Sequence, residues 1–220
     1  VLAVALFGKQ AYKHVLVNGI ILAQDGQKMS KRLKNYPDPM EVVEKYGADA
    51  LRLYLLSSPA VYAEDLNFSE KGVGEVSKKI IARFENIVSF YEMYKGNVEV
   101  AEPRFLRVLD KFLAYELYKT KDGVERALEN YCLDRASRQI SDFVDTFSTI
   151  YLQYSRDRFK EGEDGRGEAL ATLRWAIRET SKIIAPFMPF LAERTYQEMK
   201  RDGDAESVHL ESWPTFSERI

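Results

Sequence analysis

Apolar residues recur every three or four positions through the last two thirds of the chain, which is the spacing of helices with one buried face. Gly96 and a polar, glycine-rich stretch at 161–167 interrupt the pattern, and Pro186 and Pro189 must kink or divide its last segment. Long antiparallel helices joined by short links make an up-and-down bundle. The sequence therefore predicts a mainly α fold with four long helices, at 73–94, 105–130, 133–159 and 170–199.

The third of these helices carries an apolar stripe rich in aromatic residues. The stripe is expected to face the core of the bundle, with charged neighbours exposed beside it. Its members are Ala136, Ile140, Phe143, Phe147, Ile150 and Tyr154.

The first part of the chain has shorter patterns. Residues 1–7 are an apolar run that should end as a helix at Gly8, and residues 14–17 are typical of a short buried strand. Asn18 and Gly19 precede a second apolar run, which is consistent with a hairpin or with two separate strands of a parallel sheet.

Two short helices are expected next. Asp38 can cap a helix whose first position is Pro39, and Gly47 should end it. A second short helix is predicted at 49–56, before Pro59 breaks it.

Composition excludes several classes of protein. With 220 residues, 45% of them apolar and 30% charged, the chain can form one large or two small domains with a real core. Its one cysteine, Cys132, rules out a disulfide within the chain, and the two histidines, His14 and His209, are too few and too far apart for a structural zinc site. No apolar run is long enough to span a membrane. With a single cysteine, a reducing cytoplasm is the expected compartment, and no metal site is expected in this chain. The net charge of −2 requires any nucleic-acid site to be a local patch.

A basic loop follows the second apolar run. Four cations lie between Gln27 and Tyr36 with no carboxylate among them, and such a cluster favours phosphate groups. Gly26 lets the backbone turn close to a ligand, and Ser30 offers a hydroxyl group. The residues alone also allow a solvated basic face or a general nucleic-acid patch. The four cations are Lys28, Lys31, Arg32 and Lys34.

The sequence Lys-Met-Ser-Lys-Arg at 28–32 resembles the KMSKS signature of class I aminoacyl-tRNA synthetases, with arginine in the last position. The flanks Val-Asn-Gly at 17–19, Leu-Lys-Asn-Tyr-Pro-Asp-Pro at 33–39 and Tyr-Gly-Ala-Asp-Ala-Leu-Arg at 46–52 resemble isoleucyl-tRNA synthetases, particularly of the eukaryotic and archaeal type. Valyl and leucyl enzymes share the last of these segments and are the alternatives. The stretches at 128–131, 185–190 and 207–214 are similar to the anticodon-binding domain of the same enzymes.

This resemblance implies an organisation and an activity. Residues 1–62 would be the end of a Rossmann-type catalytic domain, a small α/β remnant with connecting helices, and residues 63–220 the α-helical anticodon-binding domain. The parent enzyme would be a monomer that joins isoleucine to tRNA(Ile) with ATP and Mg²⁺. The chain has no His-x-Gly-His signature, and most of the isoleucine pocket would lie outside it, so we expect the isolated chain to be inactive.

Site residues are also implied by the resemblance. Lys28, Met29, Ser30, Lys31 and Arg32 would bind ATP, with Lys31 and then Lys28 stabilising the transition state of isoleucine activation. Met29 is expected to anchor the loop by packing. The role of Arg32 is left open between phosphate and the acceptor end of tRNA.

A second candidate site lies near the end of the third helix. Aromatic and arginine side chains there could stack on anticodon bases and pair with phosphates. The alternative is a partly buried stripe with charged, exposed neighbours. Ile150, Gln153 and Lys160 depart from the pattern common in isoleucyl enzymes. These departures weaken the prediction of base stacking more than the prediction of phosphate binding. The candidate residues are Tyr151, Tyr154, Arg156, Arg158 and Lys160.

Two readings without catalysis compete with this one. The first is an RNA-binding or assembly module that has kept a synthetase-like bundle. The second is a helical bundle whose basic loop serves only its solubility, and it predicts no preference for any tRNA.

Overall fold

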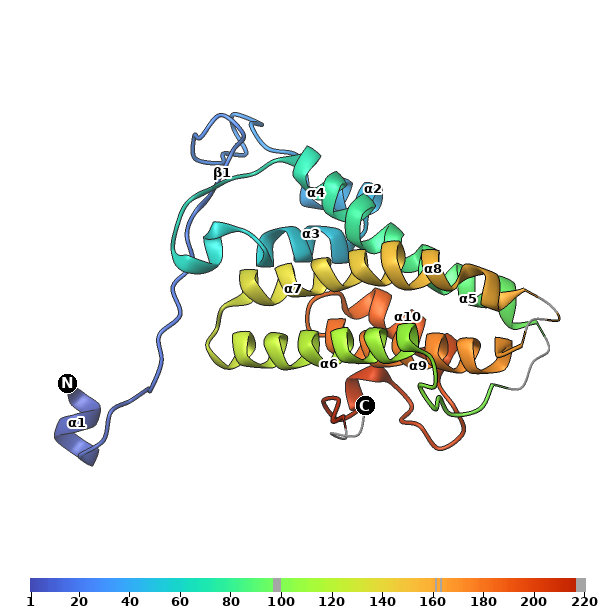
Figure 1. Cartoon of the computed structure of the whole chain (residues 1–220). Coiled ribbons are helices and arrows are strands. Elements are labelled where there is room, and N and C mark those ends of the chain that lie inside the picture. Colours follow the sequence, from blue (N-terminus) through green and yellow to red (C-terminus); the bar gives the residue numbers. More distant parts are fainter. Residues whose placement is uncertain (97–99, 161, 163, 217–220) are drawn as a thin grey trace.

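A computed structural model of the chain describes residues 1–96, 100–160, 162 and 164–216. Its larger part is a bundle of long helices that lie side by side (Figure 1). The expected divisions by Gly96 and by the two prolines are confirmed, since one helix ends at Lys95 and the fourth is split into two. The bundle helices are α5 (Ala82–Lys95), α6 (Val108–Glu129), α7 (Leu133–Thr146), α9 (Arg166–Ile184) and α10 (Pro189–Met199).

Two of the bundle helices contain a wider turn. A π-helical segment, Ser77–Ile81, joins α4 (Glu70–Val76) to α5. A second, Phe147–Leu152, continues α7 into the short α8 (Gln153–Ser155) and a 3₁₀ turn at Arg156–Phe159. Each π turn contains one residue more than an α-helical turn. The residues after it are therefore rotated around the helix axis, and different positions become buried.

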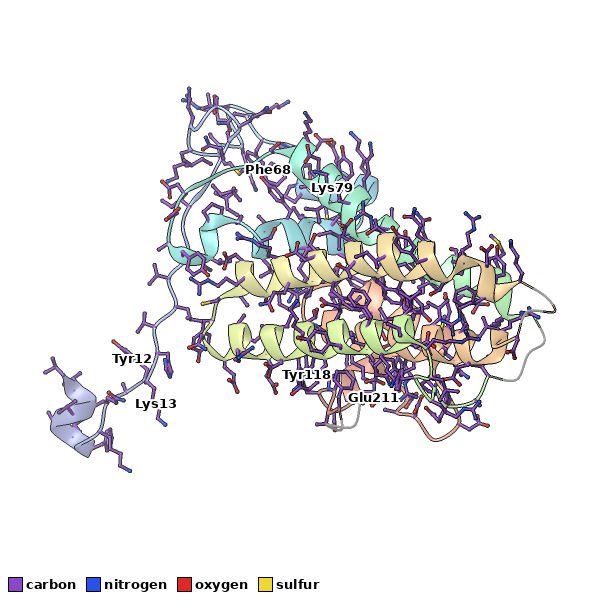
Figure 2. All side chains as sticks on the ribbon, in the orientation of Figure 1. Tyr12, Lys13, Phe68, Lys79, Tyr118 and Glu211 are labelled. Carbon is purple, nitrogen blue, oxygen red and sulfur yellow. The ribbon has the colours of Figure 1, made fainter. Side chains whose placement is uncertain are left out.

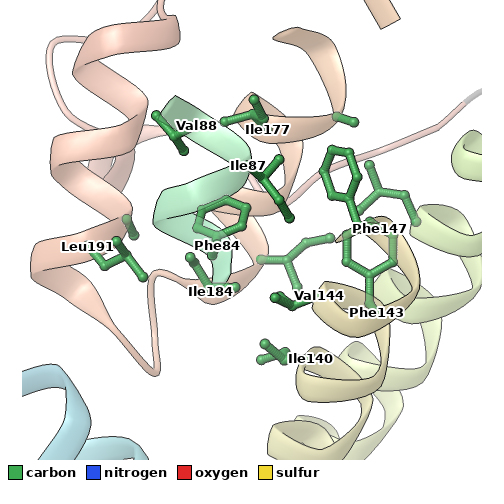
Figure 3. Close-up of a cluster of buried hydrophobic side chains, with 14 of the residues drawn as sticks. Phe84, Ile87, Val88, Ile140, Phe143, Val144, Phe147, Ile177, Ile184 and Leu191 are labelled. Atoms are coloured by element: carbon green, nitrogen blue, oxygen red, sulfur yellow. The ribbon is translucent and has the colours of Figure 1, made fainter. Parts of the chain in front are cut away.

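The core of the bundle is apolar and continuous. Side chains from α5, α7, α9, α10 and the π-helical segment after α7 meet in it. They include Phe84, Phe147 and Ile177, which are all 0% exposed (Figure 3). The predicted apolar face of the first long helix is confirmed by the burial of Val73, Ile80, Phe84, Ile87 and Tyr91.

The first part of the chain forms a smaller unit on one side of the bundle. Its sheet has two short parallel strands, β1 (Ile21–Leu22) and β2 (Leu66–Asn67), so Asn18 and Gly19 do not form a hairpin turn. Gly8 ends the first helix in a left-handed conformation, as expected. The other elements are α1 (Leu2–Phe7), α2 (Pro39–Tyr46), α3 (Ala48–Leu56), a 3₁₀ turn at Pro59–Tyr62 and, at the far end of the chain, another at Val208–Leu210.

The strand predicted at 14–17 is wrong. These residues are extended but unpaired among the described residues, and Val15, Leu16 and Val17 are each more than 60% exposed. Figure 2 shows the neighbouring Tyr12 and Lys13 on a segment that runs clear of the bundle. An apolar run alone cannot specify a strand, because a strand also needs a ladder partner.

The second long helix begins later than predicted. Residue 105 was the expected start, but Phe105 has a positive φ of 49° and α6 begins at Val108. The Phe105 ring instead packs edge-on against Trp175, with the ring centroids 4.9 Å apart. None of the helices among the described residues is long and apolar enough to cross a membrane.

Gly19 is held where no side chain fits. Its N–H donates to the Ala60 carbonyl over 2.8 Å, and a Cβ on Gly19 would lie 1.7 Å from the backbone oxygen of Glu64. Because both neighbours are backbone, we expect Gly19→Ala to shift the entry to β1 and lower the free energy of unfolding by about 1–3 kcal/mol. Thermal unfolding would measure this loss. Gly167→Ala, in α9 with nothing within 4 Å of its added Cβ, should instead be neutral or slightly stabilising.

Candidate functional site

The basic loop begins where β1 ends. Ala23 and Gln27 close a tight turn through a 2.8 Å hydrogen bond from the Ala23 N–H to the Gln27 carbonyl, and Gly26 has a φ of 79° within it. The Asp25 carboxylate accepts the Gln27 N–H at 3.0 Å, and Leu22 bridges to Lys28. These bonds fix the point at which the lysines leave the sheet.

Asn35 braces the loop from its far side. Its Oδ1 accepts the Ser30 N–H at 2.9 Å, and its Nδ2 donates to the Lys28 carbonyl at 3.2 Å. The Ser30 carbonyl in turn accepts the N–H groups of Leu33 and Lys34. Sequence reasoning gave Asn35 no structural role. Its available signal was an amide side chain five residues after Ser30, in a position to bond the loop backbone.

Met29 anchors the loop to the fold, as expected. It packs against a small cluster of buried apolar side chains contributed by α2, α3, α4 and the residue after β2, namely Val42, Ala50, Val73 and Phe68. Because its neighbours on both sides are held through Asn35, the side chain of Met29 turns inward while the lysines stay outside.

The loop cations are available to a ligand. Lys28, Lys31 and Arg32 are exposed, and none of them takes part in an ion pair among the described residues. A site that presents several unpaired cations from a braced backbone can neutralise a polyphosphate. Within the described part of the chain, no group of three or more His, Cys, Asp or Glu side chains is placed to hold a metal ion.

The second candidate site is divided between core and surface by the π turn at Phe147–Leu152. The stripe predicted for this helix placed Ile150 and Tyr154 in the core, but they are 38% and 71% exposed, so that part of the prediction is wrong. Tyr151 and Ser155 are buried instead, both at 0% exposure. The additional residue in the π turn moves the buried face along by one position.

Tyr151 and Arg158 bind a buried carboxylate. The Tyr151 hydroxyl donates to Asp110 Oδ1 at 3.0 Å, and Arg158 donates to both Asp110 oxygens at 2.8 and 2.9 Å. Asp110 is 0% exposed, and burial raises the pKa of Tyr151 well above its usual value. Because Tyr151 is buried, no base can stack on it. Tyr151 and Arg158 instead hold the end of this helix against α6 through Asp110.

Sequence reasoning missed Asp110. The sequence did contain a sign of its role. Asp110 lies three residues before Leu113 and seven before Leu117, so it occupies a position on the buried face of the same helix. An acid on the buried face of a helix needs a partner, and the nearest basic residues on the facing helix end include Arg158.

The other three candidates lie on the surface. Tyr154 and Arg156 are exposed, and Lys160 is exposed with its ammonium group 2.6 Å from Asp157. Phe159 anchors this end of the bundle by packing edge-on against Phe90, at 5.1 Å between ring centroids. The structure therefore presents an aromatic ring on α8 and two cations on and just after the 3₁₀ turn, at an end of the bundle that buried Phe159 holds in place.

The two candidate sites lie at opposite ends of the molecule. The loop beyond β1 is at one end, and α8 with the turn after it is at the other (Figure 1). An elongated ligand would be needed to contact both.

Two families of known proteins match the chain. Residues 110–219 match the anticodon-binding domain of tRNA ligase, and residues 1–69 match the class I tRNA synthetases for I, L, M and V. The first match covers half of the chain and begins at Asp110, the buried carboxylate described above.

The curated relatives include isoleucine–tRNA ligases of bacteria. That of Chlamydia trachomatis is 43% identical over 226 residues, covering 97% of this chain and 21% of the relative. That of Chlamydia muridarum is 44% identical over 220 residues with the same shares, and that of Protochlamydia amoebophila is 41% identical over 226 residues, covering 99% and 22%. The chain thus spans about a fifth of the length of the curated relatives it matches.

A solved structure has the same fold. It is the ternary complex of the LeuRS AgnB2 of Agrobacterium radiobacter K84 with tRNA and LeuAMS, with a TM-score of 0.67 at 24% identity over 92% of this chain and 24% of that one. The expected fold class is confirmed: a mainly helical bundle follows a small parallel sheet. The chain therefore belongs to the class I tRNA synthetases, in which it comprises the end of the catalytic domain and the anticodon-binding domain.

Proposed function

We propose that this chain is part of an isoleucine–tRNA ligase, in which it supplies the loop that binds the phosphates of ATP and the bundle that binds tRNA(Ile). The observation that carries the proposal is the 43% identity to the Chlamydia trachomatis ligase over 97% of the chain. The exposed lysines of the braced loop support it. A valine or leucine enzyme is the alternative, because the match at 1–69 is to a family that includes both.

The reaction assigned to the parent enzyme begins with isoleucine activation. A carboxylate oxygen of isoleucine attacks the α-phosphorus of ATP, a new O–P bond forms, and the bond to the bridging oxygen breaks as pyrophosphate leaves with the electron pair. Negative charge grows on the phosphate oxygens during this step. Lys31 first and Lys28 second would stabilise that charge, and positioned cations of this kind usually contribute most of the catalysis in phosphate chemistry.

The other members of the loop have supporting roles in this proposal. Met29 holds the loop against the fold, and the Ser30 hydroxyl bonds either the loop backbone or a phosphate oxygen. Arg32 binds either phosphate or the acceptor end of the tRNA. Mg²⁺ would accompany ATP in the parent enzyme, but the loop offers no carboxylate between Gln27 and Tyr36, so we assign it no metal ligand.

Fewer of the candidate residues can contact tRNA than the sequence implied. We assign anticodon contact to Tyr154, Arg156 and Lys160, whose side chains are exposed. Tyr151 and Arg158 belong to this site indirectly, because they hold Asp110 and fix the turn that carries the other three.

Several finer features of the parent stay predictions. They are a monomeric, cytoplasmic enzyme, an isoleucine pocket mostly outside this chain, and a domain boundary near residue 62, which the pairing of β1 with β2 crosses. The eukaryotic or archaeal subtype also stays a prediction, and the matched relatives named above are bacterial.

Fluorescence anisotropy of the chain with tRNA(Ile) tests the binding role. We expect weaker binding to the same tRNA with a changed anticodon at every salt concentration, because base contacts give specificity that phosphate contacts do not. Tyr154→Ala should weaken binding to tRNA(Ile) about 10-fold if the ring stacks on a base. Tyr12→Ala, an exposed tyrosine away from the bundle, is the control. Equal affinity for both tRNAs, with the same steep salt dependence, would contradict anticodon reading.

A further inference from the structure

Helix α3 has a charged face that turns toward the bundle. Asp49 and Arg52 are three residues apart, so they lie on one side of α3. Both contact the corner where α9 ends and α10 begins, about 140 residues further along the chain.

Asp49 caps α10 from a distance. The carboxylate is only 7% exposed, and its oxygens accept the Leu191 N–H at 2.7 Å and the Phe190 N–H at 3.4 Å. The residue at the local cap position, Met188, provides no side-chain hydrogen bond. The first amides of a helix have no partner within it and favour a negative charge, so Asp49 supplies what the local sequence lacks.

Arg52 holds the other side of the same corner. Its guanidinium donates to the Pro186 carbonyl at 3.0 Å, just after the end of α9. One helix thus offers an acid to the amide end of α10 and a base to the carbonyl end of α9. Because Asp49 and Arg52 carry opposite charges, they fix the position of α3 along this corner. A shift of α3 would place each charge near the helix end that repels it.

The same helix is connected to the lysine loop. Ala50 of α3 belongs to the cluster against which Met29 packs, and Leu51 packs against the same cluster. Helix α2, which links the loop to α3, begins at a cap formed by Asp38. A continuous path of packed and hydrogen-bonded groups therefore runs from the loop through α3 to the bundle.

We propose that Asp49, together with Arg52, is a positioning residue that fixes the lysine loop relative to the tRNA-binding bundle. This inference rests on the proposed function. A tRNA held at the far end of the bundle presents its acceptor end correctly only if this junction is rigid, and a misplacement of about 1 Å can cost roughly 100-fold in rate.

The test uses a full-length isoleucine–tRNA ligase that contains this chain. Asp49→Ala should lower kcat for tRNA charging about 10- to 100-fold, leave the KM for tRNA within about threefold, and leave isoleucine-dependent ATP–pyrophosphate exchange unchanged. Asp49→Asn keeps one acceptor oxygen for Leu191 and should fall between wild type and alanine. Arg52→Ala, which removes an exposed side chain and no core contact, should show the same split with a smaller loss. Glu44→Gln, an exposed acid on α2, is the matched control.

The outcomes separate the possible failures. Wild-type charging rates in Asp49→Asn and Arg52→Ala would overturn the positioning role, even if Asp49→Ala fails to fold. A parallel loss of charging, exchange and melting temperature in all three variants would also overturn it, since that pattern reports stability alone. A wild-type enzyme that does not charge tRNA(Ile) would overturn the proposed function instead.

Discussion

Replacing Lys31 with glutamine in a full-length ligase that contains this chain is expected to slow isoleucine-dependent ATP–pyrophosphate exchange about 100- to 1,000-fold. The side chain is exposed on a loop whose backbone is held by Asn35, and no ion pair among the described residues competes for its charge. The removed cation acts mainly on charge that develops at the phosphates, so the loss should appear in kcat more than in the KM for ATP.

Two companion variants make the result specific. Lys28→Gln should cause a smaller but clear loss, and Lys78→Gln, an exposed lysine on the π turn before α5, should stay within about twofold of wild type. Exchange does not require tRNA, so an effect of Lys78 on RNA would not enter the measurement. Near-normal exchange in both loop variants would remove the loop from the ATP site. A deeper loss for Lys28 than for Lys31 would reverse their assigned order.

The existence of the long helices could be predicted because each has a repeated local signal. Buried faces at a spacing of three and four residues, together with Gly96 and Pro189, were enough to find α5 and α10. The capped start of α2 was equally local, since the Asp38 carboxylate accepts the Met40 N–H two residues away. Such features depend on neighbours in sequence, which a sequence displays directly.

What could not be predicted depends on partners far along the chain. The π turn at Phe147–Leu152 changes which side chains are buried after it, and nothing in a periodic reading signals the extra residue. The contacts of Asp49 with α10 and of Arg158 with Asp110 join positions 142 and 48 residues apart. The strand expected at 14–17 failed for the same reason, because pairing is a property of two segments.

The second large effect is expected from Arg158. Removal of this side chain in Arg158→Ala leaves the fully buried Asp110 carboxylate with the Tyr151 hydroxyl as its one remaining side-chain hydrogen-bond donor among the described residues. Breaking a buried ion pair at one side typically costs about 3–5 kcal/mol, because the remaining charge stays buried without compensation. For a chain of this size, that loss corresponds to a fall in melting temperature of roughly 10 °C, measurable by circular dichroism.

Arg156 is the matched control two residues away, and it separates stability from binding. Arg156 is exposed and takes part in no ion pair among the described residues, so Arg156→Ala should change the free energy of unfolding by less than about 0.5 kcal/mol while weakening tRNA binding. Arg158→Ala should show the opposite pattern, because its main effect is a lower free energy of unfolding. Adding Asp110→Asn to Arg158→Ala should recover part of that loss, because it removes the uncompensated charge. Equal melting temperatures for the two arginine variants would contradict the division of this turn into a supporting core and an RNA-facing surface.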